Sequence, residues 1–239
     1  MSQPYHSILV DGYISVCFSS QGAERYFSCL LKSNIMPASR HAGREGDPFI
    51  IASVPPHIRD QFPNQNGWVL DRMVVRAGTV VPQTLWAPPT DIDRRQHIEK
   101  APLQMPIFLQ HTDGRLGVPL DAAVAGRCHS LINAQSSAPL GPLATTYIRI
   151  LWPGYVGVKR QVQIKDETPD RNTVTLSRFA QHLGRSVDAF LRNPQPDTEN
   201  PVPKWGIGGI QPNEIIIIGA IQVSSGSWMP ILQLNRYIL

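Results

Sequence analysis

The sequence predicts an α+β protein, with a mostly antiparallel sheet or open barrel and two or three short helices packed on one side. Several short segments alternate apolar and polar residues, a pattern typical of half-buried strands. Proline accounts for 22 of the 239 residues, and each proline inside a helix removes a hydrogen-bond donor. Long uninterrupted helices are therefore not expected, and the best helical pattern is confined to residues 175–192.

The first third of the chain predicts a strand, a helix and two further strands. Ile14, Val16 and Phe18 alternate with smaller residues in the segment 7–18, which predicts a strand. Apolar residues at helical spacing predict a helix over residues 23–31. The two further strands are expected at residues 49–54 and 67–81.

The middle of the chain is rich in proline and predicts mostly extended structure. A short helix is expected in the charged run at residues 91–100, and a strand follows at residues 106–110. Residues 120–131 favour a further helix, although Gly126 weakens it.

The last third predicts a hairpin, one long helix and a closing strand pair. The hairpin strands, 145–151 and 159–165, flank a turn in which Pro153 fixes φ and Gly154 accepts a positive φ. Residues 175–192 carry one apolar stripe, and the proline-rich residues after them predict an extended linker. The closing strands are expected at 215–223, apolar on both faces and therefore central, and at 228–234, where Pro230 indicates an edge or a bulge.

The whole chain, residues 1–239, is expected to form a single domain. A second core in as few residues as 1–82 would be marginal, so this part is expected to join the rest. A subdivision into residues 1–82 and 83–239 stays open, with the proline-rich linker at residues 193–204.

Several ordered motifs stand out in the second part of the chain, of which the most specific are WPGY at 152–155 and SGSW at 225–228. Through these motifs, residues 83–239 resemble a large family of uncharacterised proteins from mushroom-forming fungi. Many relatives are expected to carry histidine where this chain has Gln222. The resemblance implies kinship and compartment only, with no activity, cofactor or catalytic residue.

Composition and cysteine usage favour an intracellular protein, in the cytoplasm or nucleus. No run of about 20 apolar residues is present, so no membrane partner is expected. The first thirty residues lack a secretory signal. Three cysteines, without a CxxC pair, predict free thiols rather than a disulfide framework.

No standard catalytic signature is present, so the sequence leaves open whether the protein is an enzyme. It contains no phosphate-binding glycine loop, no HExxH and no GxSxG. The densest group of acidic and imidazole side chains, at residues 91–99, is interleaved with basic residues. We therefore expect a solvated loop there, no metal site and no cofactor.

The positive charge concentrates in one segment. Residues 140–195 carry eight Lys and Arg against four Asp and Glu, which equals the net charge of +4 of the whole chain. Arg178, His182 and Arg185 share one side of the predicted helix. Basic strand residues would lie beside them if the helix packs back on the hairpin. Two alternatives stay open for each group: the basic side is a partner surface or an ordinary solvated face, and the aromatic residues in the two turns anchor a partner or pack within the fold. The candidate binding residues are Arg149, Trp152, Tyr155, Lys159, Arg160, Arg178, His182, Arg185 and Trp228.

These residues favour a non-enzymatic binding or scaffold module that engages an acidic or polyanionic partner, such as a protein. Two alternatives remain. One is a hydrolase-like enzyme whose His, Asp and Ser residues are distant in sequence. The other is a nucleic-acid-binding protein, whose affinity would fall steeply with salt. The oligomeric state is not predicted.

Overall fold

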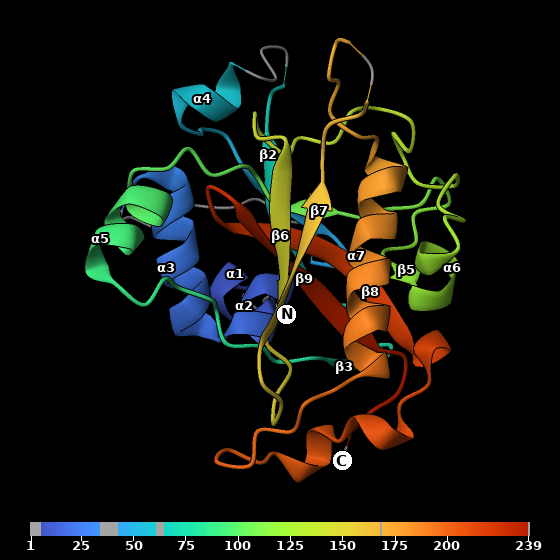
Figure 1. Ribbon diagram of the computed structural model, residues 1–239. Helices are drawn as coiled ribbons and strands as arrows, with labels where there is room; N and C mark the ends of the chain where they lie inside the picture. Colours follow the sequence, from blue (N-terminus) through green and yellow to red (C-terminus); the bar gives the residue numbers. More distant parts are fainter. Residues whose placement is uncertain (1–5, 34–42, 61–64, 168, 239) are drawn as a thin grey trace, which may run out of the picture.

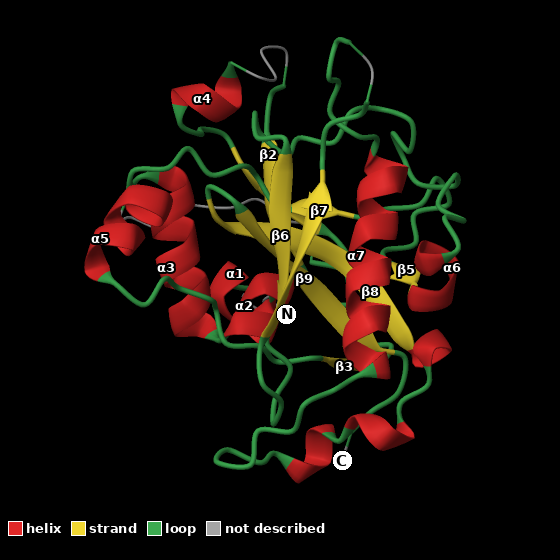
Figure 2. Cartoon of the chain, viewed as in Figure 1, coloured by secondary structure: helices red, strands yellow, loops and turns green. Residues whose placement is uncertain are grey.

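A computed structural model describes residues 6–33, 43–60, 65–167 and 169–238 of the chain. Its main sheet has seven strands, with β4, β8, β9, β6 and β7 side by side in that order, β3 beside β9 and β5 beside β8 (Figures 1 and 2). All pairings are antiparallel except that of β6 with β9. The α+β class is confirmed, and the sheet is open. The strands are β3 (Thr79–Val80), β4 (Ile107–Phe108), β5 (Val118–Pro119), β6 (Thr145–Ile150), β7 (Val158–Gln163), β8 (Ile215–Ser224) and β9 (Ser227–Leu234).

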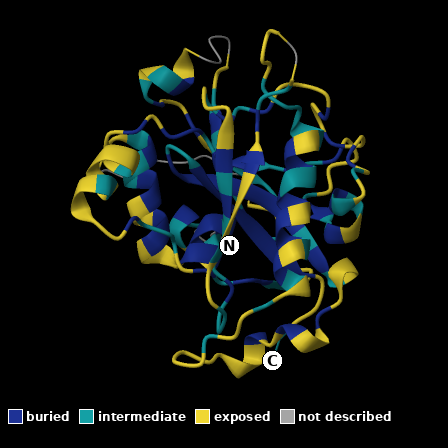
Figure 3. Cartoon of the chain, in the orientation of Figure 1, coloured by how far each residue is buried: buried dark blue, intermediate teal, exposed yellow. Residues whose placement is uncertain are grey.

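The two central strands, β8 and β9, are covered on both faces (Figure 3). Ile217 and Leu232 belong to a core that α6 (Leu120–Val124) and α7 (Leu176–Arg192) close. Ile218 and Ile231 belong to a second core on the opposite face. This second core is closed by the N-terminal residues, so helices lie on both faces rather than on one side. The covering elements are α1 (Ile8–Asp11), α2 (Tyr13–Phe18), α3 (Ser20–Leu31), β1 (Pro48–Ile51) and β2 (Trp68–Arg72).

The strand predicted for residues 7–18 is wrong, because this segment forms α1 and α2. The buried side chains of α2 are Tyr13, Ile14, Ser15, Cys17 and Phe18, whereas Val16 is 41% exposed. The Asp71 carboxylate accepts a hydrogen bond of 3.0 Å from the Ile14 N–H and caps the helix. A distant residue therefore supplies the acceptor that starts α2.

The helix predicted after it is confirmed as α3. The strand predicted at 49–54 is present in shortened form as β1, whereas the one predicted at 67–81 is interrupted and its residues form β2 and β3 in two different sheets. β1 and β2 pair antiparallel as a small separate sheet, with the short helix α4 (Pro56–Arg59) between them in the chain. β3 then joins the main sheet through Leu234 of β9. The N-terminal part thus contributes one strand to the main sheet and most of the second core.

In the middle of the chain, two short elements occupy the expected helix at 91–100: α5 (Asp91–Arg94) and a π-helical turn, η1 (Arg95–Glu99). The expected strand at 106–110 is present as β4. The helix expected over 120–131 is too long, since α6 ends at Val124 and Gly126 follows with a φ of 74°. A positive φ is incompatible with a continuing right-handed helix.

The hairpin of β6 and β7 and the helix α7 are confirmed. The Thr175 side chain accepts a hydrogen bond from the Arg178 N–H at the start of α7. Residues 193–204 do not form a detached linker, because the Val156 N–H donates to Gln195 O and the Asp197 N–H to Gly154 O. Three short 3₁₀ turns lead on to β8: η2 (Pro203–Trp205), η3 (Ile207–Gly209) and η4 (Pro212–Glu214).

The central position predicted for β8 is confirmed, but the interpretation of Pro230 is wrong. β9 lies inside the sheet, and the irregular steps of the β8–β9 ladder place the extra residues in β8. On its other side β9 pairs with β6 at Ser227 and Trp228, and with β3 at Gln233 and Leu234. Pro230 falls between these two pairings, where its missing N–H leaves no ladder bond unmade. Its carbonyl accepts a hydrogen bond from the Gln83 side chain.

No helix in the described part of the chain combines the length and the apolar character needed to cross a bilayer.

Candidate functional site

Helix α7 lies against β7 (Figure 1). Four basic side chains gather where these two elements meet. Arg178, His182 and Arg185 come from the helix and Arg160 from the strand. The Arg160 Nη1 donates a hydrogen bond of 2.9 Å to the carbonyl oxygen of Arg185, which ties strand to helix. The three arginines are exposed and His182 is partly buried. We call these four residues the basic face.

Acidic neighbours among the described residues do not neutralise the charge of the basic face. Within the described ranges, no carboxylate lies within 4 Å of the guanidinium groups of Arg160, Arg178 or Arg185. Arg178 donates instead to the neutral amide of Gln181. Arg192, at the end of the same helix, shows the contrast, because its Nε lies 2.9 Å from Asp188. The arginines of the basic face thus keep their full charge at the surface.

His182 responds to this concentration of charge. Burial, followed by the charges of Arg178, Arg185 and Arg160, lowers the pKa of its imidazole to about 4. The imidazole is therefore neutral at physiological pH in the folded protein, whereas its pKa in the unfolded chain is about 6.5. The contribution of this pKa difference to the free energy of unfolding is fully present above about pH 6.5. It is lost as the pH falls toward 4.

We expect the imidazole of His182 to titrate at about pH 4 when followed by NMR in the folded protein. Arg178→Gln should raise this pKa, because the charge of Arg178 is the largest cause after burial. Arg192→Gln serves as the control, since Arg192 is already paired with Asp188. A midpoint near 6.5 in the unaltered protein would contradict the charge arrangement described here.

Two of the predicted basic residues lie on the opposite face of the hairpin. Residues directly paired across antiparallel strands share a face. Arg160 pairs with Ile148, which faces the core under α7. Lys159 pairs with Arg149, so both point to the other face. The expectation that all the basic residues form one surface is therefore wrong.

Arg149 and Lys159 contact aromatic rings on that opposite face. The guanidinium of Arg149 lies 3.6 Å from the centre of the Trp86 ring, and its Nε donates to the Ser227 hydroxyl. Burial lowers the pKa of Arg149. The ammonium of Lys159 lies 5.5 Å from the centre of the Tyr147 ring. Arg149 is thus used within the fold and is not free to meet a partner.

Of the two alternatives for the tryptophan rings in the turns, packing within the fold is confirmed and exposure to a partner is wrong. Trp152 is 1% exposed and its indole N–H donates to Trp205 O at 2.9 Å. Trp228 is fully buried and packs edge-on against Phe179 of α7. Tyr155 is half-buried, and its hydroxyl accepts a hydrogen bond from the Ile207 N–H. These rings attach the turns and the C-terminal segment to α7.

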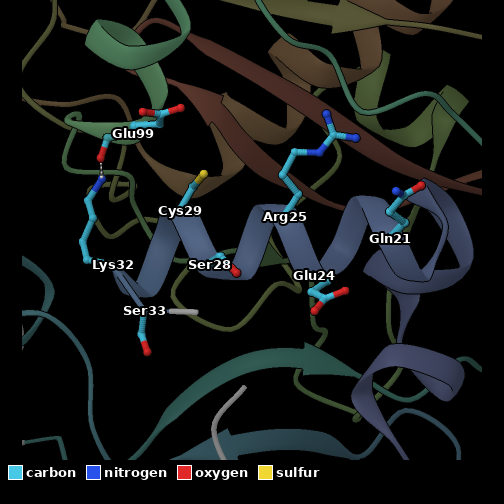
Figure 4. Close-up of a pocket in the computed structure, with 8 residues that line it drawn as sticks. All are labelled: Gln21, Glu24, Arg25, Ser28, Cys29, Lys32, Ser33 and Glu99. Atoms are coloured by element: carbon cyan, nitrogen blue, oxygen red, sulfur yellow. Dashed lines mark hydrogen bonds between the residues drawn. The ribbon is translucent and has the colours of Figure 1, made fainter. Parts of the chain in front are cut away.

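The WPGY turn borders a groove of about 1150 Å³, opposite the first turn of α3. A second concavity, of about 780 Å³, lies along the outer side of α3 (Figure 4). There the ammonium of Lys32 donates hydrogen bonds to the carbonyl oxygens of Ile98, Glu99 and Ala101. Its hydrogen-bond donors are therefore used within the fold. Cys29 also borders it, and burial raises the pKa of its thiol.

In the part of the chain that the structure describes, groups that would serve a metal or a thiol nucleophile are not brought together. The described residues contain no cluster of three or more His, Cys, Asp or Glu side chains that could hold a metal ion. All three cysteines are free, as expected. Burial raises the pKa of Cys17 to about 12 and that of Cys128 above its usual value. Protonated thiols are poor nucleophiles.

Gln222, where histidine is expected in relatives, has a structural contact set. It is 3% exposed, accepts a hydrogen bond of 2.7 Å from the Gln104 N–H and donates to Ser225 O. It therefore joins the middle segment to the β8–β9 turn.

A third cleft, of about 510 Å³, contains residues that the sequence analysis missed. Arg72 of β2 lines it together with Gln110, which follows β4, and Tyr13 of α2. The Arg72 Nη2 donates to the Gln110 side chain at 2.7 Å, and the Tyr13 hydroxyl donates to Gln233 at 2.8 Å. The only local signal in the sequence is the charged pair Asp71–Arg72 at the end of an apolar strand.

The chain was compared with protein-family models, with curated proteins and with solved structures, and none of the three comparisons returned a match.

Proposed function

We propose that the protein is a binding module whose basic face engages an acidic segment of a partner protein. The observation that carries this proposal is the meeting of three guanidinium groups, from Arg160, Arg178 and Arg185, around one neutral imidazole without a pairing carboxylate among the described residues. Such a surface concentrates negative charge from solution and accelerates encounter with an acidic partner.

A partner protein accounts for this surface better than a single-stranded nucleic acid does. Sequence-tolerant binding of single strands uses aromatic rings on which bases stack. Trp152 and Trp228, the rings expected for that role, are buried. Carboxylates need only the guanidinium forks that the basic face presents.

The hydrolase alternative finds less support. Two histidines contact serine hydroxyls: His97 contacts Ser225 at 3.1 Å, and His111 contacts Ser130 at 2.8 Å. Neither serine lines any of the three cavities described above. The second nitrogen of His111 contacts a backbone carbonyl, that of Gly117, rather than a carboxylate. A nucleophile without a substrate cavity does not favour catalysis.

The test uses labelled poly-L-glutamate as the probe in fluorescence anisotropy. The combined variant Arg160→Gln, Arg178→Gln and Arg185→Gln should bind at least about tenfold more weakly, because three charge-assisted contacts are lost. The affinity of the unaltered protein should fall as salt is added, and the variant should show a shallower dependence.

The matched control removes three charges elsewhere, in the variant Arg59→Gln, Arg95→Gln and Arg127→Gln. These arginines are exposed and lie outside the basic face. Equal losses in both triple variants would mean that only net charge matters and would contradict the proposal. Tighter binding to oligothymidylate than to poly-L-glutamate at equal salt would assign the surface to nucleic acid instead.

A further inference from the structure

The third cleft brings together charged side chains from segments far apart in the sequence. Arg72 comes from β2, and Glu45 and Asp47 come from the segment that leads into β1. Its volume of about 510 Å³ falls in the usual range for small-molecule sites, roughly 300–1,000 Å³. The cleft lies between the N-terminal part and the main sheet, whose Gln233 also lines it.

Among the described residues, the guanidinium of Arg72 has neutral partners only. Its Nη1 donates to Gly46 O at 2.9 Å and its Nη2 to the Gln110 side chain, while its buried Nε has no hydrogen-bond acceptor in this part of the chain. No carboxylate of the described residues lies within 4 Å of it, although the charge of Asp47 acts on it from a greater distance. Burial of this cation is therefore incompletely compensated.

The two carboxylates of the cleft also lack a cationic side chain within ion-pair distance in the described part of the structure. Glu45 accepts a hydrogen bond of 2.9 Å from the Arg76 N–H, and Asp47 accepts one of 2.8 Å from the Arg44 N–H. Positive and negative groups thus border one cleft without pairing with each other. A ligand that carries both charges would complement both.

Part of the remaining wall of the cleft is apolar, beside the polar side chains of Arg115, Gln233 and Asn235. Val75, Leu116, Pro119 and Ile216 contribute to the lining. Apolar walls with a few oriented polar groups are typical of sites for small molecules.

We propose that this cleft binds a small zwitterion with an apolar side chain, such as a free aliphatic amino acid. The carboxylate of the ligand pairs with the guanidinium of Arg72, and its ammonium pairs with Glu45 and Asp47. Its side chain contacts the apolar wall. This site is separate from the basic face and does not depend on the function proposed for it.

Isothermal titration with three matched compounds tests the proposal. L-leucine carries both charges, 4-methylpentanoate lacks the ammonium and 3-methylbutylamine lacks the carboxylate. We expect saturable binding of leucine at least about tenfold tighter than that of either other compound, because each of them lacks one of the two ion pairs. Equal or tighter binding of 4-methylpentanoate, or no binding of leucine, would overturn the proposal.

Two variants locate the site. Glu45→Gln keeps the acceptor for the Arg76 N–H and should weaken leucine binding about tenfold without loss of the fold. Arg72→Gln should abolish it, and Arg44→Gln, an exposed neighbour outside the lining, should leave it unchanged. If Glu45→Gln binds leucine as the unaltered protein does, the assignment of the ammonium to this carboxylate is wrong.

Discussion

Replacement of Asp71 with alanine is expected to lower the free energy of unfolding by about 3–5 kcal/mol. The carboxylate is fully buried and accepts hydrogen bonds from the backbone N–H groups of Ile14 and Arg72. Each donor left unsatisfied in the interior costs about 1–3 kcal/mol. Urea unfolding followed by circular dichroism measures the loss.

The isosteric variant Asp71→Asn is the control, because its side-chain oxygen still accepts hydrogen bonds. A loss below about 1 kcal/mol in the alanine variant would contradict the role of Asp71 as the cap of α2.

The unaltered protein and the Asp71→Asn variant also allow a test of pH dependence. Burial raises the pKa of Asp71 well above its usual value, so the folded state holds this proton more tightly than the unfolded state does.

The stability of the unaltered protein relative to Asp71→Asn should therefore decline as the pH rises above about 4, until the pH passes the folded-state pKa. The unfolded carboxyl loses its proton first in this range, which favours unfolding. The measurement is the free energy of unfolding of each protein between about pH 4 and 8. The value for Asp71→Asn is subtracted from that of the unaltered protein at each pH. A difference that is constant or rises with pH would contradict the direction of the shift.

Replacement of Gly219 with alanine is expected to have the second-largest effect, a loss of about 3 kcal/mol or a fall of about 6–12 °C in Tm. Gly219 lies in β8 opposite Phe108 of β4. A Cβ atom built there would lie 2.1 Å from the carbonyl oxygen of Ile107. Both groups belong to paired backbone, so relief requires β4 to separate from β8.

Gly208→Ala is the matched control, because a Cβ atom at that glycine would meet nothing within 4 Å. Its Tm should stay close to that of the unaltered protein. Thermal unfolding of the two variants side by side separates the steric effect from the general preference of glycine for flexible backbone. Equal Tm values in both variants would show that β4 can move away from β8 without a loss of stability.

Elements whose pattern is complete within a short segment were predictable from the sequence. The stripe of α7 and the β6–β7 hairpin each depend on neighbours a few residues away. The helix α2 was not predictable in this way. Its first turn is capped by Asp71, 57 residues from Ile14, so no local signal marks its start. The apparent alternation of Ile14, Val16 and Phe18 then suggests a strand.

In the candidate site, too, only the residues related by local spacing were predictable from the sequence. Arg178, His182 and Arg185 share a helix face by spacing alone, and the structure places Arg160 beside them. The separation of Arg149 and Lys159 from this group depends on which hairpin face meets α7, which the sequence leaves open. The charges of the third cleft come from residues that only the packing of the N-terminal part on the sheet brings together. For this reason they escaped the sequence analysis.

The burial of β8 and β9 on both faces has a consequence for any shortened form of the protein. Ile218, Ile221 and Ile231 are covered by residues that precede position 82. Proteolytic removal of that part would expose the apolar side chains of β8 and β9 to water. Exposed apolar surfaces of this kind tend to self-associate. We therefore expect cleavage near residue 82 to yield aggregates rather than a smaller soluble unit.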